Sequence, residues 1–270
     1  MALVVCPTPI GNLEDVTLRV LRELAEADLV LCEDTRRTRS LLDRHGVSAR
    51  LESYHRHNEA RRTKELLPRL CAGERIALAS DAGLPGVNDP GARLIAAAIA
   101  AGVEVTVLPG PSAVETALVA SGLLGEGYLF VGYLPRGRIA LRRLWGELAR
   151  WGAPVVAFES PRRLPESLAS LAEADPERPV AVCRELTKLF EEIVRGTARE
   201  AAARFGDPPK GEITVVIGPS EGIDERAQGE EEAAAAFAEL LAAGVPRGRA
   251  AALVSRLTGV PRNRLYRAGL

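Results

Sequence analysis

Residues 80–91 of this 270-residue chain read Ser-Asp-Ala-Gly-Leu-Pro-Gly-Val-Asn-Asp-Pro-Gly. They follow the apolar run 75–79, which predicts a strand, and precede 92–99, an apolar pattern of helical length. Connections from strand to helix in α/β proteins usually take about two to six residues, whereas this one takes twelve. Its three glycines let the backbone approach a ligand closely. The stretch therefore predicts an α/β sheet that binds a ligand where this strand ends.

Two more predicted strands end in loops rich in proline and glycine. The run 3–6 leads into Pro7-Thr8-Pro9-Ile10-Gly11-Asn12, and the run 103–108 leads into Pro109-Gly110-Pro111-Ser112-Ala113. Because ligands of open α/β sheets bind at the carboxyl ends of the strands, the three loops together predict a small-molecule cleft. None of them matches G-x-G-x-x-G or the phosphate-binding G-x-x-x-x-G-K-[ST] pattern. The three loops therefore suit a ligand with few or no phosphates better than a ligand that binds through its phosphates.

The order of the apolar runs predicts two α/β domains with a cofactor cleft between them, followed by a small helical module. Strands and helices alternate in 1–121, which indicates a mostly parallel sheet covered on both faces. In 122–220 the strand candidates crowd together, which indicates a second α/β domain with a mixed sheet. Strands are expected near 2–6, 28–32, 50–54, 75–79, 103–108, 128–133, 154–158, 179–183, 190–195 and 212–217. Helices are expected near 16–26, 35–45, 58–72, 89–101, 111–122, 138–150, 162–174 and 197–205.

Charge divides the end of the chain into two parts. Residues 221–232 contain six acidic side chains and one arginine, whereas 245–270 contain six arginines and no acidic residue. This asymmetry predicts an acidic linker over 221–232 and a basic helical module over 233–270. One helix ends at Gly259 and another opens at Pro261, a pattern similar to a helix-turn-helix. A stabilising appendage or a dimer contact is the alternative.

The composition favours a cytoplasmic protein without a membrane anchor or a metal. Pro7 and Pro9 interrupt the first apolar run, and no apolar stretch approaches the about eighteen residues of a membrane span. The four cysteines include no C-x-x-C pair, and Cys6, Cys32 and Cys183 lie in apolar runs. We therefore expect buried free thiols in a reducing compartment. The three histidines lack partners at metal-binding spacing, so no metal site is expected.

Eight short motifs occur along the chain in the order that one known family shows. They are Pro7-Thr8-Pro9-Ile10-Gly11-Asn12-Leu13, Glu33-Asp34-Thr35-Arg36, His57-Asn58-Glu59, Ser80-Asp81-Ala82-Gly83 with Asn88-Asp89-Pro90-Gly91, Pro109-Gly110-Pro111-Ser112-Ala113, Phe158-Glu159-Ser160-Pro161, Arg184-Glu185-Leu186-Thr187-Lys188 and Lys210-Gly211-Glu212. On these motifs the chain resembles the ribosomal RNA small subunit methyltransferase I family of the tetrapyrrole-methylase superfamily, over essentially its whole length. Leu84 departs from the pattern, because the family usually has Thr after Asp-Ala-Gly.

The resemblance implies a tetrapyrrole-methylase-like fold, S-adenosyl-L-methionine as methyl donor, and a homodimer. It implies as acceptor the ribose 2′-hydroxyl of a cytidine in 16S rRNA, in the decoding region of the small ribosomal subunit. A sulfonium donor carries no phosphate, which suits loops that lack a phosphate-binding pattern. The residues expected at the cofactor are Pro7, Thr8, Asp81, Ala82, Gly83, Leu84, Val87, Gly110, Pro111, Ser112 and Ala113.

Lysine is rare in this chain, which has 32 arginines and three lysines. An ammonium can lose its proton whereas a guanidinium cannot, so the remaining lysines are candidates for chemistry. Lys188 and Lys210 lie in turn-like segments beside glutamates, and we expect at least one of them to orient or deprotonate the ribose hydroxyl, with Glu185 nearby. Ion pairing is the alternative role. The other candidates for a base are Glu185, Glu212, Asp34, His55 and His57.

Arginines and polar loop residues are the expected contacts to RNA. The net charge of −1 argues against a general nucleic-acid binder. Local arginine runs can neutralise phosphates, although a solvated helix face is the alternative. The aromatic content of 4% argues against a stacking platform and favours recognition of folded rRNA by shape and backbone. The expected contacts are Arg36, His57, Asn58, Arg247, Arg249, Arg262 and Arg264.

Two other functions stay open. A tetrapyrrole C-methyltransferase of the uroporphyrinogen or precorrin type would share the fold and the donor but leave the basic module unexplained. A nucleic-acid-binding regulator without enzymatic activity would explain the module but would not need the donor. Binding of S-adenosylmethionine separates the regulator from the two enzymes.

Overall fold

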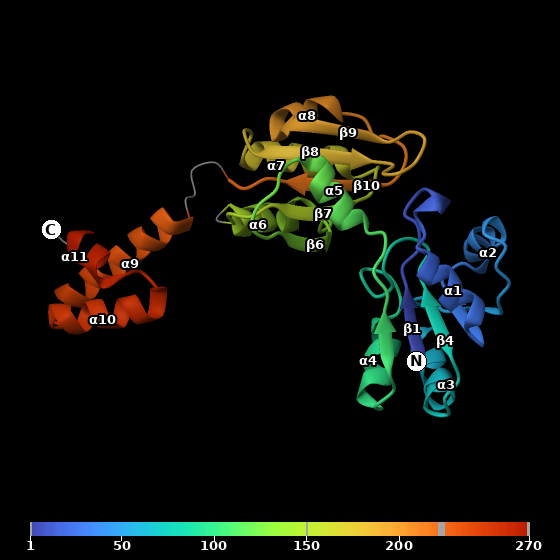
Figure 1. Ribbon diagram of the computed structural model, residues 1–270. Helices are drawn as coiled ribbons and strands as arrows, with labels where there is room; N and C mark the ends of the chain where they lie inside the picture. The colour runs from blue at the N-terminus through green and yellow to red at the C-terminus, as the bar shows by residue number, and fades with distance from the viewer. Residues whose placement is uncertain (1, 150, 221–224, 269–270) are drawn as a thin grey trace.

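The computed structural model describes residues 2–149, 151–220 and 225–268. The described chain forms two five-stranded sheets with helices against them, and a separate group of helices at the end (Figure 1). The predicted fold class, two α/β units and a helical module, is confirmed.

The first sheet is entirely parallel and has the strand order β3-β2-β4-β1-β5. Its strands are β1 (Leu3–Cys6), β2 (Leu29–Cys32), β3 (Leu51–Ser53), β4 (Ile76–Ala79) and β5 (Val105–Val107). Every residue of β1, β2 and β4 is buried. These strands read as unbroken apolar runs because both of their faces are covered by helices.

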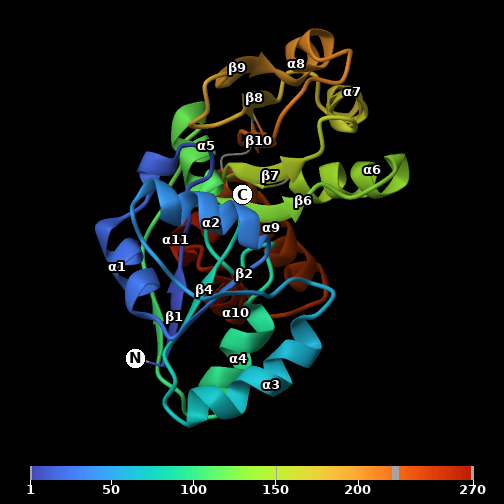
Figure 2. The same ribbon diagram turned by 90° about the vertical axis from the view of Figure 1, so that its right-hand side faces the viewer.

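Two helices cover each face of this sheet (Figure 2). They are α1 (Leu18–Glu26) and α2 (Thr35–Arg44) on one face, and α3 (Glu59–Cys71) and α4 (Ala92–Ala100) on the other. The Thr17 hydroxyl caps α1 by accepting a hydrogen bond from Val20 N (3.1 Å), and the Asp34 carboxylate caps α2 through Arg36 N (2.9 Å). A 3₁₀ turn, η1 (Leu13–Asp15), precedes α1.

The second sheet is mixed, as predicted, with the order β6-β7-β10-β8-β9. Its strands are β6 (Leu129–Tyr133), β7 (Val155–Glu159), β8 (Pro179–Arg184), β9 (Glu192–Thr197) and β10 (Ile213–Ile217). Only the β6–β7 pair is parallel. The helices α6 (Arg138–Leu148), α7 (Leu164–Ala174) and α8 (Ala198–Arg204) pack on one face of this sheet.

Helix α5 (Ala113–Ser121) packs on the opposite face of the second sheet. Val114, Ala117 and Leu118 share one buried cluster with Val156 and Val216 of that sheet. The predicted domain boundary between 121 and 122 therefore lies one helix too late. The reason is that α5 follows β5, which is the edge of the first sheet, and its apolar face is covered by the second sheet instead.

The end of the chain forms α9 (Glu225–Ala242), α10 (Arg247–Thr258) and α11 (Arg262–Ala268), which pack around Phe237 and Val254. Helix α10 ends at Gly259, which has a left-handed φ of 76°, as the sequence predicts. The expected linker 221–232 is wrong from Glu225 onward, because α9 begins there in a stretch rich in the helix formers Ala and Glu. Residues 221–224 lie outside the described residues.

An ion pair between the buried Glu23 of α1 and the partly exposed Arg75, just before β4, should contribute measurably to stability. Arg75 Nη2 donates to Glu23 Oε2 over 2.6 Å, and this hydrogen bond lowers the pKa of the Glu23 carboxyl. Arg75→Met should lower the free energy of unfolding at pH 7 by about 2 kcal/mol, as for a lost hydrogen bond to a charged group. Because the lowered pKa stabilises the fold only while Glu23 is ionised, the deficit should shrink as the pH falls below 4.5.

Denaturant titrations of both proteins at several pH values measure this effect. Arg44→Met is the matched control, because Arg44 pairs with Glu14 where both side chains are exposed. A deficit in Arg75→Met that is no larger than that of the control, or that is independent of pH, would contradict the role of the pair.

Candidate functional site

The three loops that the sequence singles out leave neighbouring strands at the same edge of the first sheet. Strands β4, β1 and β5 are adjacent and parallel, so their carboxyl ends meet. Thr8 and Gly83 form an isolated β-bridge, in which each backbone N–H donates to the other's carbonyl over 2.9 Å. Gly83 has a φ of +76°, a left-handed conformation that glycine adopts readily. The predicted convergence of the loops is confirmed.

Hydrogen bonds of two buried hydroxyl groups hold this bridge in place. The Thr8 hydroxyl donates to the Ser80 carbonyl over 3.0 Å, and the Ser80 hydroxyl donates to the Gly83 carbonyl over 2.7 Å. Thr8 and Ser80 are both buried. The loop after β4 is therefore held against the loop after β1 by backbone and side-chain hydrogen bonds together.

A cavity of about 860 Å³ lies between these loops and the second sheet, and we refer to it as the inter-sheet cavity. Ten of the eleven residues that the sequence assigns to the cofactor line it: Pro7, Asp81, Ala82, Gly83, Leu84, Val87, Gly110, Pro111, Ser112 and Ala113. Thr8 does not, because its hydroxyl points to Ser80 and its other side faces a neighbouring cavity. Leu84 adds an apolar side chain where the family usually has a hydroxyl.

The second sheet supplies a wall whose residues the sequence did not assign to the cofactor. It consists of Phe130, Tyr133, Phe158, Glu159, Ser160, Pro161, Cys183, Leu186, Gly211, Glu212, Ile213 and Thr214. The motifs 158–161 and 210–212 were the available signal, but nothing in the sequence says which side of the second sheet faces the first. The burial of Cys183 raises the pKa of its thiol to about 11, so it is an inert part of this wall.

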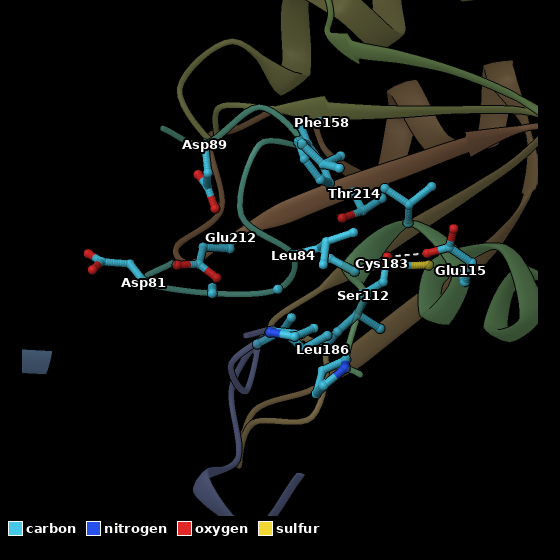
Figure 3. A pocket seen from close by; sticks show the side chains of 18 of the residues that line it. Asp81, Leu84, Asp89, Ser112, Glu115, Phe158, Cys183, Leu186, Glu212 and Thr214 are labelled. Carbon is cyan, nitrogen blue, oxygen red and sulfur yellow. Dashed lines mark hydrogen bonds between the residues drawn. The ribbon is translucent and has the colours of Figure 1, made fainter. Parts of the chain in front are cut away.

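The lining of the inter-sheet cavity is polarised (Figure 3). Asp81, Asp89 and Glu212 gather at one end, and Leu84 and Phe158 lie between them and the other end. At that other end the Ser112 hydroxyl donates to the Glu115 carboxylate. The hydroxyl of Tyr128 donates to the same carboxylate. The cavity therefore offers carboxylates at both ends and an apolar middle.

The acidic end concentrates negative charge. Burial, together with the neighbouring carboxylates of Glu33 and Asp81, raises the pKa of Asp89 to about 6. Asp81 Oδ1 accepts a hydrogen bond from Asp34 N (2.9 Å), and its Oδ2 lies 3.7 Å from Arg37 Nη1. A cationic group bound at this end would relieve the repulsion among these carboxylates.

Lys188 forms an ion-pair cluster with Glu185 and Glu212 at the boundary of the two sheets. Lys188 Nζ donates to Glu185 Oε1 (2.8 Å) and to Glu212 Oε2 (3.0 Å). Burial on its own would lower the pKa of this ammonium, but the two carboxylates outweigh it and the pKa is raised. The cluster therefore holds a charged lysine, which favours an orienting role over deprotonation.

The loop that carries Lys188 touches the loop after β1. A Cβ atom on Gly11 would lie 2.5 Å from Lys188 Cγ and 2.6 Å from the Leu186 carbonyl oxygen, so only glycine fits there. Glu185 and Thr187 both have positive φ, at 52° and 65°. The backbone of this loop is thus bent so that Lys188 faces the first sheet.

A second, smaller cavity of about 330 Å³ adjoins the first, and we refer to it as the α2 cavity. It is bounded by the loop after β1, by α2 and by the start of the loop after β4, with Lys188 and Glu212 from the second sheet. Five residues line both cavities: Ile10, Arg37, Asp81, Ala82 and Glu212.

Several predicted site residues lie outside both cavities. Lys210 is exposed and lines neither of them. Asp34 caps α2 and pairs with Arg36 (Oδ2 to Nη2, 2.7 Å). The hydrogen bonds from Arg36 lower the pKa of Asp34 to about 2, so Asp34 is too weak a base to accept a proton from a hydroxyl. This pairing also engages Arg36, one of the expected RNA contacts.

The His57-Asn58-Glu59 motif has a structural role in its own turn and beside the long loop. Asn58 Oδ1 accepts from His55 N (2.8 Å), and its amide donates to the Ser53 carbonyl (3.2 Å), so these hydrogen bonds orient the Asn58 side chain within its own turn. Glu59 Oε1 accepts from Gly91 N over 3.2 Å, which fixes the end of the loop 80–91. His57 is exposed and lines neither cavity.

The arginines of the helical module differ in their surroundings. The Arg247 guanidinium lies 5.6 Å from the centre of the Tyr266 ring, and its Nη2 donates to the Tyr266 carbonyl. Arg249 and Arg262 line a hollow between α9 and α10 together with Arg256. The module thus presents several cations around one concave surface.

Within the described residues, no group of three or more His, Cys, Asp or Glu side chains is placed to hold a metal ion. None of the helices in that part of the chain combines the length and the apolar character that a membrane span requires.

Comparison with known proteins agrees with the geometry. Residues 2–202 match the family described as tetrapyrrole (corrin/porphyrin) methylases, and 227–270 match the RsmI C-terminal HTH domain. A ribosomal RNA small subunit methyltransferase I of Mesorhizobium japonicum is 47% identical over 98% of this chain and 90% of its own length.

Solved structures share the fold. The methyltransferase CobJ has a TM-score of 0.62 at 23% identity, over 81% of this chain and 94% of its own. The uroporphyrin-III C-methyl transferase of Thermus thermophilus, solved with S-adenyl homocysteine, has a TM-score of 0.56 at 22% identity, over 80% of this chain and 96% of its own. On the family match and the close relatives, the chain belongs to the ribosomal RNA small subunit methyltransferase I family, within the tetrapyrrole methylases.

Proposed function

We propose that this protein transfers a methyl group from S-adenosyl-L-methionine to the ribose 2′-hydroxyl of a cytidine in 16S rRNA of the small ribosomal subunit. The observation that carries the proposal is the inter-sheet cavity of about 860 Å³, in a chain whose relatives act, by their names, on small-subunit rRNA. These names also favour an enzyme over a regulator without activity.

The inter-sheet cavity fits the donor. S-adenosylmethionine supplies an activated methyl group on a positively charged sulfur. The carboxylates of Asp81, Asp89 and Glu212 give one end of the cavity the opposite charge, while Leu84 and Phe158 offer apolar surface to an adenine ring. The backbone of Gly83 and of 110–112 can approach the ligand closely, because no long side chain stands between.

The protein contributes to the reaction in two ways: it positions the two reactants, and it accepts the proton of the hydroxyl. Holding two reactants in line can lower a barrier by about 7–11 kcal/mol. Glu212 lines both cavities, as Asp81 does, and its carboxylate can accept the proton of a hydroxyl at their junction. Lys188 is a positioning residue, since its ammonium holds that carboxylate at 3.0 Å and Glu185 holds the ammonium in turn.

The helical module supports an RNA substrate over a tetrapyrrole. Its match to a helix-turn-helix domain and its arginines around one hollow suit the phosphates of RNA. A macrocycle substrate, the alternative, leaves this module without a role. A homodimer and a cytoplasmic location stay predictions from the resemblance and the composition.

The direct test is methyl transfer from labelled donor to small ribosomal subunits that lack the modification, compared with transfer to uroporphyrinogen. We expect the label in a 2′-O-methylcytidine of 16S rRNA, identified by mass spectrometry of nuclease digests. Label in the macrocycle alone would contradict the proposal.

The orienting role of Lys188 predicts that two substitutions at this position will change the methylation rate by different amounts. Lys188→Met removes the charge that holds Glu212, so the single-turnover rate should fall about 10²-fold. Lys188→Arg keeps a cation between the two carboxylates, so it should retain more of the rate than Lys188→Met. Lys210→Met, at an exposed lysine outside both cavities, is the control and should keep the parental rate.

A deprotonating lysine would give the opposite pattern. In that case Lys188→Arg would be as slow as Lys188→Met, and the wild-type rate would depend on the ionisation of a lysine. Such a result would contradict the orienting role.

The module's arginines predict a change in salt dependence. Arg249→Gln with Arg262→Gln should weaken binding to the small subunit and lower the log–log salt slope by about two, because each phosphate contact contributes about one unit. Binding of S-adenosylhomocysteine should not change. Arg138→Gln with Arg142→Gln removes the same charge from a pair of arginines that contact Glu173, and serves as the control. An equal slope in both double variants would show that Arg249 and Arg262 do not contact phosphates.

A further inference from the structure

The proposed function places the donor in the inter-sheet cavity and gives the α2 cavity no role. Its own lining, outside the residues it shares with the inter-sheet cavity, consists of Thr8, Pro9, Gly11, Leu13, Thr38, Ser40, Leu41, Ser80 and Lys188. A volume of about 330 Å³ is near the lower end of ligand pockets, about 300 Å³. The α2 cavity therefore suits one small unit, whereas the larger cavity has more room for the donor.

The two cavities meet at a shared wall. Asp81 and Glu212 line both of them, so a group bound in the α2 cavity lies next to whatever occupies the acidic end of the inter-sheet cavity. Methyl transfer needs the acceptor oxygen and the methyl group side by side. The junction of the two cavities, beside Asp81 and Glu212, is where the acceptor oxygen and the methyl group can meet.

The charges around the α2 cavity match a phosphoribose. Lys188 and Arg37 are the cations in its lining: Arg37 lies on α2, and Lys188 lies in the loop between β8 and β9. The Arg37 side chain is 64% exposed, and its 3.7 Å contact to Asp81 is longer than a hydrogen bond, so its N–H groups can donate to a phosphate. The carboxylates of Asp81 and Glu212 can accept hydrogen bonds from ribose hydroxyls.

From this juxtaposition we infer that the α2 cavity is the acceptor site, which receives the phosphoribose of the target nucleotide while the inter-sheet cavity holds the donor. The inference rests on the proposed function. It assigns the 2′-hydroxyl to the junction beside Glu212 and a backbone phosphate to Arg37. It also explains why Lys188 faces the α2 cavity rather than the larger one.

Filling the α2 cavity from two sides tests the inference. Ser40→Trp adds a large side chain from α2, and Leu13→Trp adds one from η1 on the other wall. Ser48→Trp is the matched control, because Ser48 is exposed on the same domain and lines neither cavity. For each variant we would measure the melting temperature, the affinity for S-adenosylhomocysteine by calorimetry, and kcat and KM with small ribosomal subunits.

The expected result is a separation of donor from acceptor. Both α2-cavity variants should bind S-adenosylhomocysteine within about twofold of wild type, while kcat/KM for the subunit falls about tenfold or more. Ser48→Trp should match wild type in every measurement. If one variant fails to fold, its melting temperature shows this and the other variant decides.

Two outcomes would overturn the inference: an unchanged kcat/KM in folded variants, or a loss of S-adenosylhomocysteine affinity equal to the loss of kcat/KM. Failure of the proposed function would look different, because wild-type protein would then leave the small subunit unmethylated. In that case the acceptor assignment falls with it.

Discussion

The backbone bridge between Thr8 and Gly83 is the contact on which the site depends. It joins the loops that leave β1 and β4, two strands that are far apart in the sequence but adjacent in the sheet. The hydroxyls of Thr8 and Ser80 lock the bridge from the buried side. Since Asp81, Ala82 and Gly83 line the inter-sheet cavity, the bridge determines where one wall of the cavity stands.

The two sheets are joined by the packing of α5 and by a close contact between two loops. Helix α5 crosses to the second sheet and buries its apolar face there. Gly11 packs directly on the loop 186–188, where no side chain would fit. These contacts bring Lys188 and Glu212, from the second sheet, to the edge where the first sheet's loops end. The ion-pair cluster and the acidic end of the cavity follow from that placement.

Local sequence patterns predicted most of the fold and one wall of the site. Strands β1 and β4 are apolar runs, and they and β5 lead into glycine- and proline-rich loops. Both features depend on residues close in the chain. Helix α10 ends at Gly259 for the same local reason, since its left-handed φ suits glycine. Thr8 was expected at the cofactor from its place in such a loop, and the sequence does not reveal that its hydroxyl donates to the Ser80 carbonyl.

The rest depends on contacts between distant segments. Nothing near residue 113 reveals that α5 packs on the second sheet, because its apolar face would suit either sheet. The ionisation of Lys188 is set by Glu185 and by Glu212, which is 24 residues away along the chain. The hydrogen bonds of Asn58 to Ser53 and His55 are local, but they depend on the conformation of the turn, which the residue types alone do not reveal.

In the proposed site the donor binds between the two sheets, against both the bridged loops and the wall that the second sheet supplies. A crystal structure of the protein with S-adenosylhomocysteine is the most direct test. We expect the ligand to contact Gly83 and 110–112 on one side and the second sheet on the other, and to leave the α2 cavity open. A ligand seated in the α2 cavity, or bound to one sheet alone, would contradict this placement of the donor.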